Sequence, residues 1–166
     1  MNIIPYERKF KREHFSCGKP ALDNYILRNV TTDVSSGACT CFVIIDENET
    51  VIAFYTLSAD SIPSVDAPQE LKKKINYPHF PVILLGRLAV DQKYKGKSYG
   101  KLLLIDALKK SVLVSKTQVG SMALIVDPID EEAENFYMKY GFTKIPDSGK
   151  MFMTMRKIEE ALGLSS

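Results

Sequence analysis

The sequence predicts an α/β protein whose mixed sheet has helices packed on both faces. First, apolar runs of strand length alternate with amphipathic segments in the order α, β, β, β, α, β, α, β, β. Second, no internal repeat, low-complexity block or Gly/Ser linker divides the 166 residues, so we expect one domain over residues 1–166. Third, 45% of the residues are hydrophobic and 25% are charged, as in soluble globular proteins.

The first half of the chain predicts a helix and a hairpin. In "KPALDNYILRNVTTDV", residues 19–34, apolar side chains recur every four residues, which predicts an amphipathic helix with Pro20 near its start and Gly37 just beyond its end. These apolar side chains are Leu22, Ile26, Val30 and Val34. In "TCFVIIDENETVIAFYTLSA", residues 40–59, two apolar runs surround the polar "DENET", a pattern typical of a hairpin.

The second half follows a Pro-rich connection over residues 61–80. "PVILLGRLAV", residues 81–90, is apolar enough for a buried central strand. A helix follows, with Leu104, Ile105, Leu108 and Val112 on one face. The remaining segments predict a buried strand in "SMALIVDP" (121–128), a helix in "DEEAENFYMKYG" (130–141) closed by Gly141, and a final strand pair in "FTKI" (142–145) and "KMFMTMRK" (150–157).

Several classes of protein are disfavoured by composition. No segment reaches the roughly 18 apolar residues of a membrane helix, and no apolar run follows the basic N-terminus. Cys17, Cys39 and Cys41 are odd in number and lack zinc-ligand spacing, while the two histidines lie near no cysteine pair. We therefore expect a cytoplasmic protein with no metal site and no membrane partner.

A basic segment marks the junction between the central strand and the next helix. "VDQKYKGKSYGKLLLIDALKK", residues 90–110, holds six lysines, with Gly96 and Gly100 where the strand gives way to the helix. Unpaired N–H groups at a helix N-terminus attract anions, and glycine lets the backbone approach a phosphate. The segment is therefore either a phosphate cradle or a solvated lysine-rich loop; "KGKSYGK" lacks the spacing of a P-loop.

The wider pattern "RLAVDQKYKGKSYGKLLL", followed some thirty residues on by "AENFYMKYGF", resembles the GCN5-related N-acetyltransferase (GNAT) family. The resemblance implies a GNAT fold, with a mixed, mostly antiparallel sheet of about six to seven strands. In that family an Arg or Gln, two residues of any type, a Gly, one further residue and a Gly or Ala wrap the pyrophosphate of acetyl-coenzyme A. Here Lys95 takes the first position and Ser98 replaces a glycine, so Ser98 must either tolerate the glycine φ or donate its hydroxyl to phosphate.

From this resemblance we expect coenzyme A contacts along the loop and the strand before it. The expected cofactor-binding residues are Leu88, Ala89, Val90, Lys95, Gly96, Lys97, Ser98, Tyr99, Gly100 and Lys101. The strand implies backbone groups that line the pantetheine arm, with the Val90 N–H near the thioester carbonyl, where it would stabilise an oxyanion.

Tyr137, in "NFYMKYGF", matches the tyrosine that the family keeps beside the thioester sulfur. A phenol with a pKa of about 10 stays protonated at neutral pH and can donate to a departing thiolate, which makes Tyr137 the expected general acid. The alternative is an aromatic that packs with Phe136 and Phe142; Tyr140 is expected to pack. No general base is evident: Asp130 and Glu134 are candidates for a proton relay, or simply partners of a helix dipole.

The segments "FSCGKPALDNYI", "SSGACTCFVIID", "AFYTLSADSI" and "VILLGRLAVD" extend the resemblance to the acetyltransferase toxins of toxin–antitoxin pairs, which acetylate aminoacyl-tRNA. The implied partners are aminoacyl-tRNA, a small DNA-binding antitoxin and a second copy in a homodimer. In that branch Arg87 lies by the acceptor cleft, so we expect it to bind a phosphate or the terminal adenosine of tRNA; a buried ion pair is its alternative. Lys72–Lys74 and the cluster of Lys9, Lys11 and Arg12 would follow the tRNA backbone or form solvated faces.

Two further functions stay open from the residues alone. The same chemistry could serve a protein N-terminus, a polyamine or a small-molecule amine. A module that binds coenzyme A or RNA without turnover is the non-enzymatic alternative, which Ser98 leaves open.

Overall fold

The computed structural model describes residues 2–164. In this part of the chain seven strands form one sheet in the order β1-β2-β3-β4-β5-β7-β6. The assigned strand pairs are antiparallel except for β4 with β5, which is parallel. A mixed, mostly antiparallel sheet flanked by helices confirms the predicted fold class.

The chain forms two compact units, and β3, β4 and α4 each continue from one unit into the other. The first unit contains residues up to Ser58 and Gly86–Ala107, and the second contains Ala59–Leu85 and residues from Leu108 on. The units are described separately below.

The first unit is built on the predicted hairpin. Strand β2 (Thr40–Ile45) pairs with β3 (Val51–Pro63), and the carboxylate of Asp46 accepts hydrogen bonds from the N–H groups of Asn48 and Thr50 in the turn. A short strand that the sequence analysis missed, β1 (Ile4–Pro5), pairs with β2.

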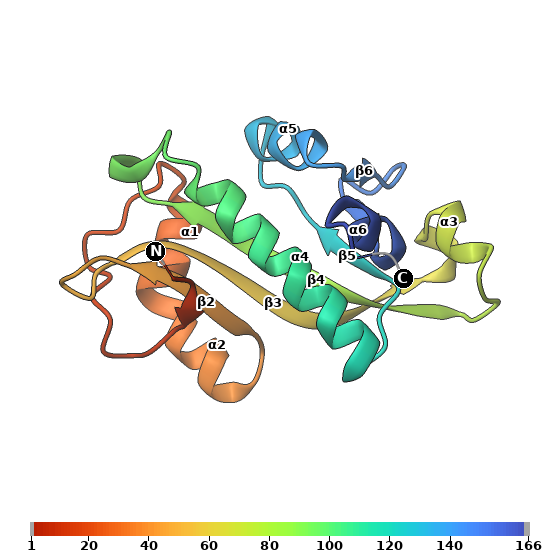
Figure 1. Cartoon of the computed structure of the whole chain (residues 1–166), viewed down its shortest axis with the longest axis horizontal. Helices are drawn as coiled ribbons and strands as arrows, with labels where there is room; N and C mark the ends of the chain where they lie inside the picture. The colour runs from red at the N-terminus through yellow and green to blue at the C-terminus, as the bar shows by residue number, and fades with distance from the viewer. Residues whose placement is uncertain (1, 165–166) are drawn as a thin grey trace. The chain divides into compact units, whose positions relative to one another are not determined.

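The predicted helix over residues 19–34 consists of three segments that pack beside β2 (Figure 1). They are α1 (Pro20–Asn24), a π-helical turn (Tyr25–Asn29) and α2 (Val30–Ser36), which Gly37 ends at φ 83°. Apolar residues four apart drift around an α-helix, which has 3.6 residues per turn. The wider i→i+5 turn returns them to one face. As a result Ile26 and Val30 are fully buried in one core cluster with Val43 and Phe54.

The second unit corrects the prediction for the Pro-rich connection. The Pro-rich connection over residues 61–80 is shorter than expected, because β3 extends to Pro63 and β4 begins at His79. Between them lie a 3-10 turn (Ser64–Asp66) and a short helix, α3 (Gln69–Lys72). Leu71 of α3 joins Phe80 and Ile125 in the core of this unit.

The remaining strands and helices follow the predicted order, with one helix added. They are β4 (His79–Val90), a 3-10 turn (Gln92–Tyr94), α4 (Tyr99–Thr117), β5 (Ala123–Val126), α5 (Glu131–Lys139), β6 (Thr143–Lys144), β7 (Met151–Thr154) and α6 (Met155–Ala161). On α4, Leu104, Leu108 and Val112 are buried as expected, while Ile105 is half-buried.

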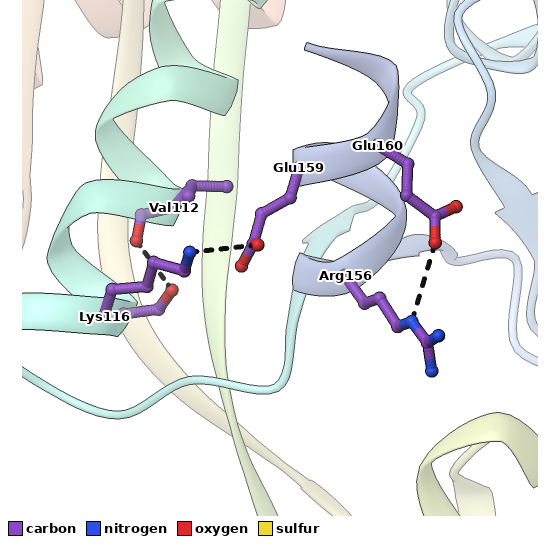
Figure 2. Close-up of polar contacts among 6 residues, drawn as sticks. Val112, Lys116, Arg156, Glu159 and Glu160 are labelled. Atoms are coloured by element: carbon purple, nitrogen blue, oxygen red, sulfur yellow. Dashed lines mark hydrogen bonds and ion pairs between the residues drawn. The ribbon is translucent and has the colours of Figure 1, made fainter. Parts of the chain in front are cut away.

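The predicted strand over residues 150–157 was too long, because helix α6 begins at Met155. The Thr154 side chain caps this helix by accepting from the Lys157 N–H. Figure 2 shows how the end of α4 is tied to α6: Lys116 Nζ lies 3.0 Å from Glu159 Oε2. Lys157 Nζ also donates to the Gly141 carbonyl at 2.8 Å, so α6 holds the C-terminal end of α5 as well.

Candidate active site

The last residues of β4 extend beyond its parallel pairing with β5. The final assigned pair is Leu85 with Val126, where β5 ends, and β4 continues to Val90. Ala89 is buried, and Leu88 and Val90 are half-buried. The assigned pairing of β4 with β5 therefore ends before Leu88–Val90, the residues expected to line the pantetheine arm.

Asp91 fixes the point at which the chain leaves β4. Its backbone N–H donates to Ile52 O, and its carboxylate accepts from Ser16 N at 3.1 Å and Lys93 N at 2.9 Å. The Gln92 N–H donates to Ser16 O. Because Asp91 is buried, these bonds are shielded from water and hold the start of the loop against the N-terminal segment.

Close packing between Gly18 and Gln92 also holds the start of the loop against the N-terminal segment. A Cβ at Gly18, whose φ is 91°, would lie 2.6 Å from Gln92 Nε2. The φ favours glycine, and a side chain at this position would also displace the end of the Gln92 side chain.

The predicted phosphate loop is exposed and takes up two left-handed backbone positions. Gly96 has φ 80° and Ser98 has φ 64°. Serine therefore adopts the conformation for which the family uses glycine, which resolves the question that the substitution raised. The Ser98 carbonyl accepts from Leu102 N at 3.1 Å, so intrahelical bonding in α4 begins at Leu102. The N–H groups of the first turn precede Leu102 and have no acceptor within the helix, and they lie at the positive end of the helix dipole.

The lysine side chains of this loop form no ion pairs with acidic residues of the described chain. Lys95, Lys97 and Lys101 are exposed and form no ion pair within residues 2–164. Tyr94 and Tyr99 meet edge to face at 6.0 Å, and Lys97 Nζ lies 5.5 Å from the Tyr94 ring centroid. The loop therefore presents unpaired positive charge beside a helix N-terminus, where an anion can bind.

Arg87 lies flat on an aromatic ring instead of in an ion pair. Its Cζ is 3.6 Å from the centroid of the Tyr25 ring. In the described part of the chain Arg87 forms no ion pair and donates no side-chain hydrogen bond. The buried ion pair considered from the sequence is therefore absent there, and the guanidinium keeps its donors for another acceptor.

Tyr137, on α5 in the second unit, is buried with a phenol that lacks a protein hydrogen-bond partner. Its ring meets Phe136 at 5.3 Å and Phe142 at 5.4 Å, both edge to face. No hydrogen bond joins its hydroxyl to another residue of the described chain. Burial raises the pKa of this hydroxyl well above that of an ordinary phenol. No buried side-chain oxygen or nitrogen of the described residues lacks a hydrogen-bond partner, so this unpaired hydroxyl is open to solvent while the ring packs against Phe136 and Phe142.

Other predicted residues have structural roles. The Asp130 carboxylate caps α5 by accepting from Ala133 N at 2.9 Å, and Glu134 pairs with Lys144 at 2.5 Å. Arg12 donates to the Ile26 and Leu27 carbonyls, so its guanidinium is engaged with the π-helical turn. Tyr140, expected to be the packing residue, is only half-buried, whereas Tyr137 is buried.

Sequence reasoning missed Tyr25 and Asp91. An aspartate directly after a buried strand is a recognisable turn and cap signal, which could have indicated Asp91. Nothing in the local sequence connects Tyr25 with Arg87. Within residues 2–164 no group of three or more His, Cys, Asp or Glu side chains could hold a metal ion, and no helix there has the length and apolar character needed to span a bilayer.

These features define an acetyltransferase of the GNAT type. Residues 37–144 match the acetyltransferase (GNAT) domain model, and the chain belongs to the GNAT acetyltransferase family. It is accordingly an acetyl-coenzyme A-dependent acyltransferase.

Among individual proteins, the chain is similar to a tRNA-acetylating toxin of Mycobacterium tuberculosis, with 34% identity over 148 residues that cover 89% of this chain and 87% of the relative. Two solved structures share its fold. AtaT complexed with acetyl-methionyl-tRNAfMet has a TM-score of 0.88 at 23% identity, covering 97% of this chain and 98% of AtaT. A tyrosine-to-phenylalanine mutant of AtaT, bound to the C-terminus of the antitoxin AtaR and acetyl-CoA, has a TM-score of 0.81 at 20% identity and covers 97% of each chain.

Proposed function

We propose that this enzyme transfers the acetyl group of acetyl-coenzyme A to the amino group of aminoacyl-tRNA and thereby blocks the use of that tRNA in translation. The observation that carries the acceptor assignment is Arg87, a half-buried guanidinium stacked on an aromatic ring with no acidic partner in the described chain. Such a group suits the phosphate or terminal adenosine of a nucleic acid. The 34% identical relative is itself a tRNA-acetylating toxin.

The phosphates of acetyl-coenzyme A would bind at the loop from Lys95 to Lys101. Gly96 and Ser98 turn the backbone there, and the unpaired lysines add positive charge. The backbone of Leu88–Val90 would hold the pantetheine arm, with the Val90 N–H near the thioester carbonyl. Coenzyme A should then raise the melting temperature by mass action, and replacing Gly100 with leucine should abolish that shift.

Tyr137 would act as the general acid. The amine attacks the thioester carbonyl, a C–N bond forms, and the C–S bond breaks as the tetrahedral intermediate collapses. The hydroxyl of Tyr137 gives its proton to the departing thiolate, the amine releases its proton to water, and water returns a proton to the Tyr137 phenolate. Because burial raises the pKa of Tyr137, the hydroxyl is protonated at neutral pH, as a general acid must be before it donates.

No dedicated base is needed for this acceptor. An α-amino group titrates near 7.7–8.0, whereas a lysine side chain titrates near 10.4, and an ester next to the α-amine lowers its pKa further. Much of the acceptor therefore arrives neutral. This agrees with the structural roles of Asp130 and Glu134, which cap α5 and pair with Lys144.

Salt dependence tests the acceptor. If Arg87 and surface lysines contact tRNA phosphates, each contact should contribute about −0.7 to −0.9 to the slope of log affinity against log salt concentration. Arg87→Ala should reduce acetylation of charged tRNA strongly and make that slope shallower. Equal rates on free amino acids and on their tRNA esters, without a salt effect, would favour a small-amine acceptor and contradict the proposal.

The proposal includes a cellular setting. Charged tRNA is cytoplasmic, so the enzyme would act there, restrained by a small DNA-binding antitoxin. Expression of the wild type should stop growth, whereas expression of Tyr137→Phe should not. Homodimer formation is a separate expectation, which sedimentation of the purified protein would test.

A further inference from the structure

Tyr25 lies at the centre of a cluster that the catalytic steps above do not use. It occupies the π-helical turn between α1 and α2, and only 3% of its surface is exposed. One face of its ring carries the Arg87 guanidinium at 3.6 Å, and its edge meets Phe54 at 6.3 Å. Its hydroxyl lies 3.2 Å from Cys39 Sγ.

The cluster fixes the ring more firmly than it fixes the arginine. Burial and the contact with Cys39 raise the pKa of Tyr25, so its hydroxyl stays protonated and the ring stays neutral. Arg87 has no ion pair within residues 2–164 to set its orientation. A guanidinium held only through its flat face keeps its N–H edge free to bind two oxygens at once.

We infer that Tyr25 is a positioning residue for the acceptor: its ring holds the Arg87 guanidinium in the plane from which it contacts the phosphate of the bound aminoacyl-tRNA. This inference rests on the proposed function. It assigns the work to the ring and not to the hydroxyl, since the hydroxyl points to Cys39 and is engaged there.

The π-helical turn gives this inference a second support. π-turns are uncommon and occur often at functional sites. Here Tyr25 and Ile26, two consecutive residues of the turn, are both buried. Tyr25 thereby reaches the arginine while Ile26 continues the apolar face of the helix.

The test compares Tyr25→Phe, which keeps the ring, with Tyr25→Leu, which removes it. Acetylation of charged tRNA is measured as kcat and KM, together with coenzyme A affinity. We expect Tyr25→Leu to raise KM for charged tRNA about tenfold or more with kcat less affected, because the guanidinium loses the ring whose cation–π contact holds it in place. Tyr25→Phe should restore most of the wild-type KM.

Phe15→Leu is the matched control for lost packing. Phe15 meets Phe54 edge to face at 5.5 Å in the same core cluster, but among the described residues Arg87 makes its cation–π contact with Tyr25 and not with Phe15. It should lower the melting temperature as Tyr25→Leu does, while leaving KM for charged tRNA unchanged. A KM increase of equal size in Phe15→Leu would assign the effect of Tyr25→Leu to general destabilisation and overturn the inference.

A double-mutant cycle decides whether Tyr25 acts through Arg87. In the Arg87→Ala background, Tyr25→Leu should have little further effect on KM, because the group that it positions is gone. Full additivity would overturn the inference. If the wild type acetylates charged tRNA and Tyr25→Leu does so with a normal KM, the inference about Tyr25 is refuted and the proposed function stands. A wild-type enzyme that acetylates no charged tRNA refutes the proposed function, and the inference with it.

Discussion

Ser98 provides the most direct test of the loop, because its backbone is strained in a way that can be calculated. At φ 64° a residue with a Cβ carries about 1–2 kcal/mol of left-handed strain. Glycine escapes that strain but loses about 0.5–1 kcal/mol of additional backbone entropy on folding. Ser98→Gly should therefore stabilise the protein by about 0.5–1 kcal/mol. For a chain of this length the melting temperature should rise by about 1–4 °C.

Two comparison variants make this test specific. Lys97→Gly, at an exposed neighbour without a positive φ, should lower the melting temperature, because there glycine relieves no strain. Ser98→Val places a β-branched side chain at a positive φ and should lower both stability and coenzyme A affinity. Calorimetry with and without coenzyme A measures both quantities. A lower melting temperature for Ser98→Gly, or normal cofactor affinity for Ser98→Val, would refute the reasoning.

Three further predictions concern Tyr137 and Asp91. Tyr137→Phe should fold and bind coenzyme A but turn over about 10²- to 10⁴-fold more slowly, the usual contribution of a positioned acid; a near-normal rate would leave Tyr137 a packing residue. The raised pKa of folded Tyr137 means that at alkaline pH its hydroxyl ionises in the unfolded chain before it ionises in the folded one. Above about pH 10 the free energy of unfolding should therefore fall more steeply for the wild type than for Tyr137→Phe, by roughly 1.4 kcal/mol per pH unit. Equal slopes for the two proteins would contradict this. Asp91→Ala removes a buried acceptor of two N–H groups. It should lower the free energy of unfolding by about 2–4 kcal/mol and weaken coenzyme A binding. Asp46→Ala also frees two N–H groups but should leave cofactor affinity unchanged.

The sequence predicted helices and strands correctly where the spacing of apolar residues and the turn or capping residues at the ends of each element agreed. The run 81–90 is apolar except for Arg87, and it forms most of the long strand β4. The "DENET" hairpin formed as predicted, since Asp46 satisfies the turn with its own side chain. Helix α6 was missed because the alternating run "KMFMTMRK" continues a strand pattern past Thr154, which in fact caps a helix. A capping serine or threonine can only be recognised once the strand before it is known to end.

The candidate site was likewise predictable only where local sequence patterns carry it. The loop and Tyr137 could be proposed from the sequence because short motifs with fixed spacing carry them. The left-handed backbone of Ser98 was posed as a question and could not be answered from residue type, since serine seldom adopts φ 64°. The stack of Arg87 on Tyr25 joins residues 62 positions apart. Only the packing of the π-helical turn against the sheet brings them together, and no local pattern encodes that contact.

The central claim is acetyl transfer to aminoacyl-tRNA, and one measurement tests it most directly. Purified protein is incubated with isotopically labelled acetyl-coenzyme A, a pool of charged tRNA and a pool of peptides, and the products are identified by mass spectrometry, with Tyr137→Phe as the matched control. We predict labelled acetyl groups on the α-amine of aminoacyl-tRNA, formed by the wild type and strongly reduced in Tyr137→Phe. Label found only on peptides or free amines, or no label on any acceptor, would contradict the account.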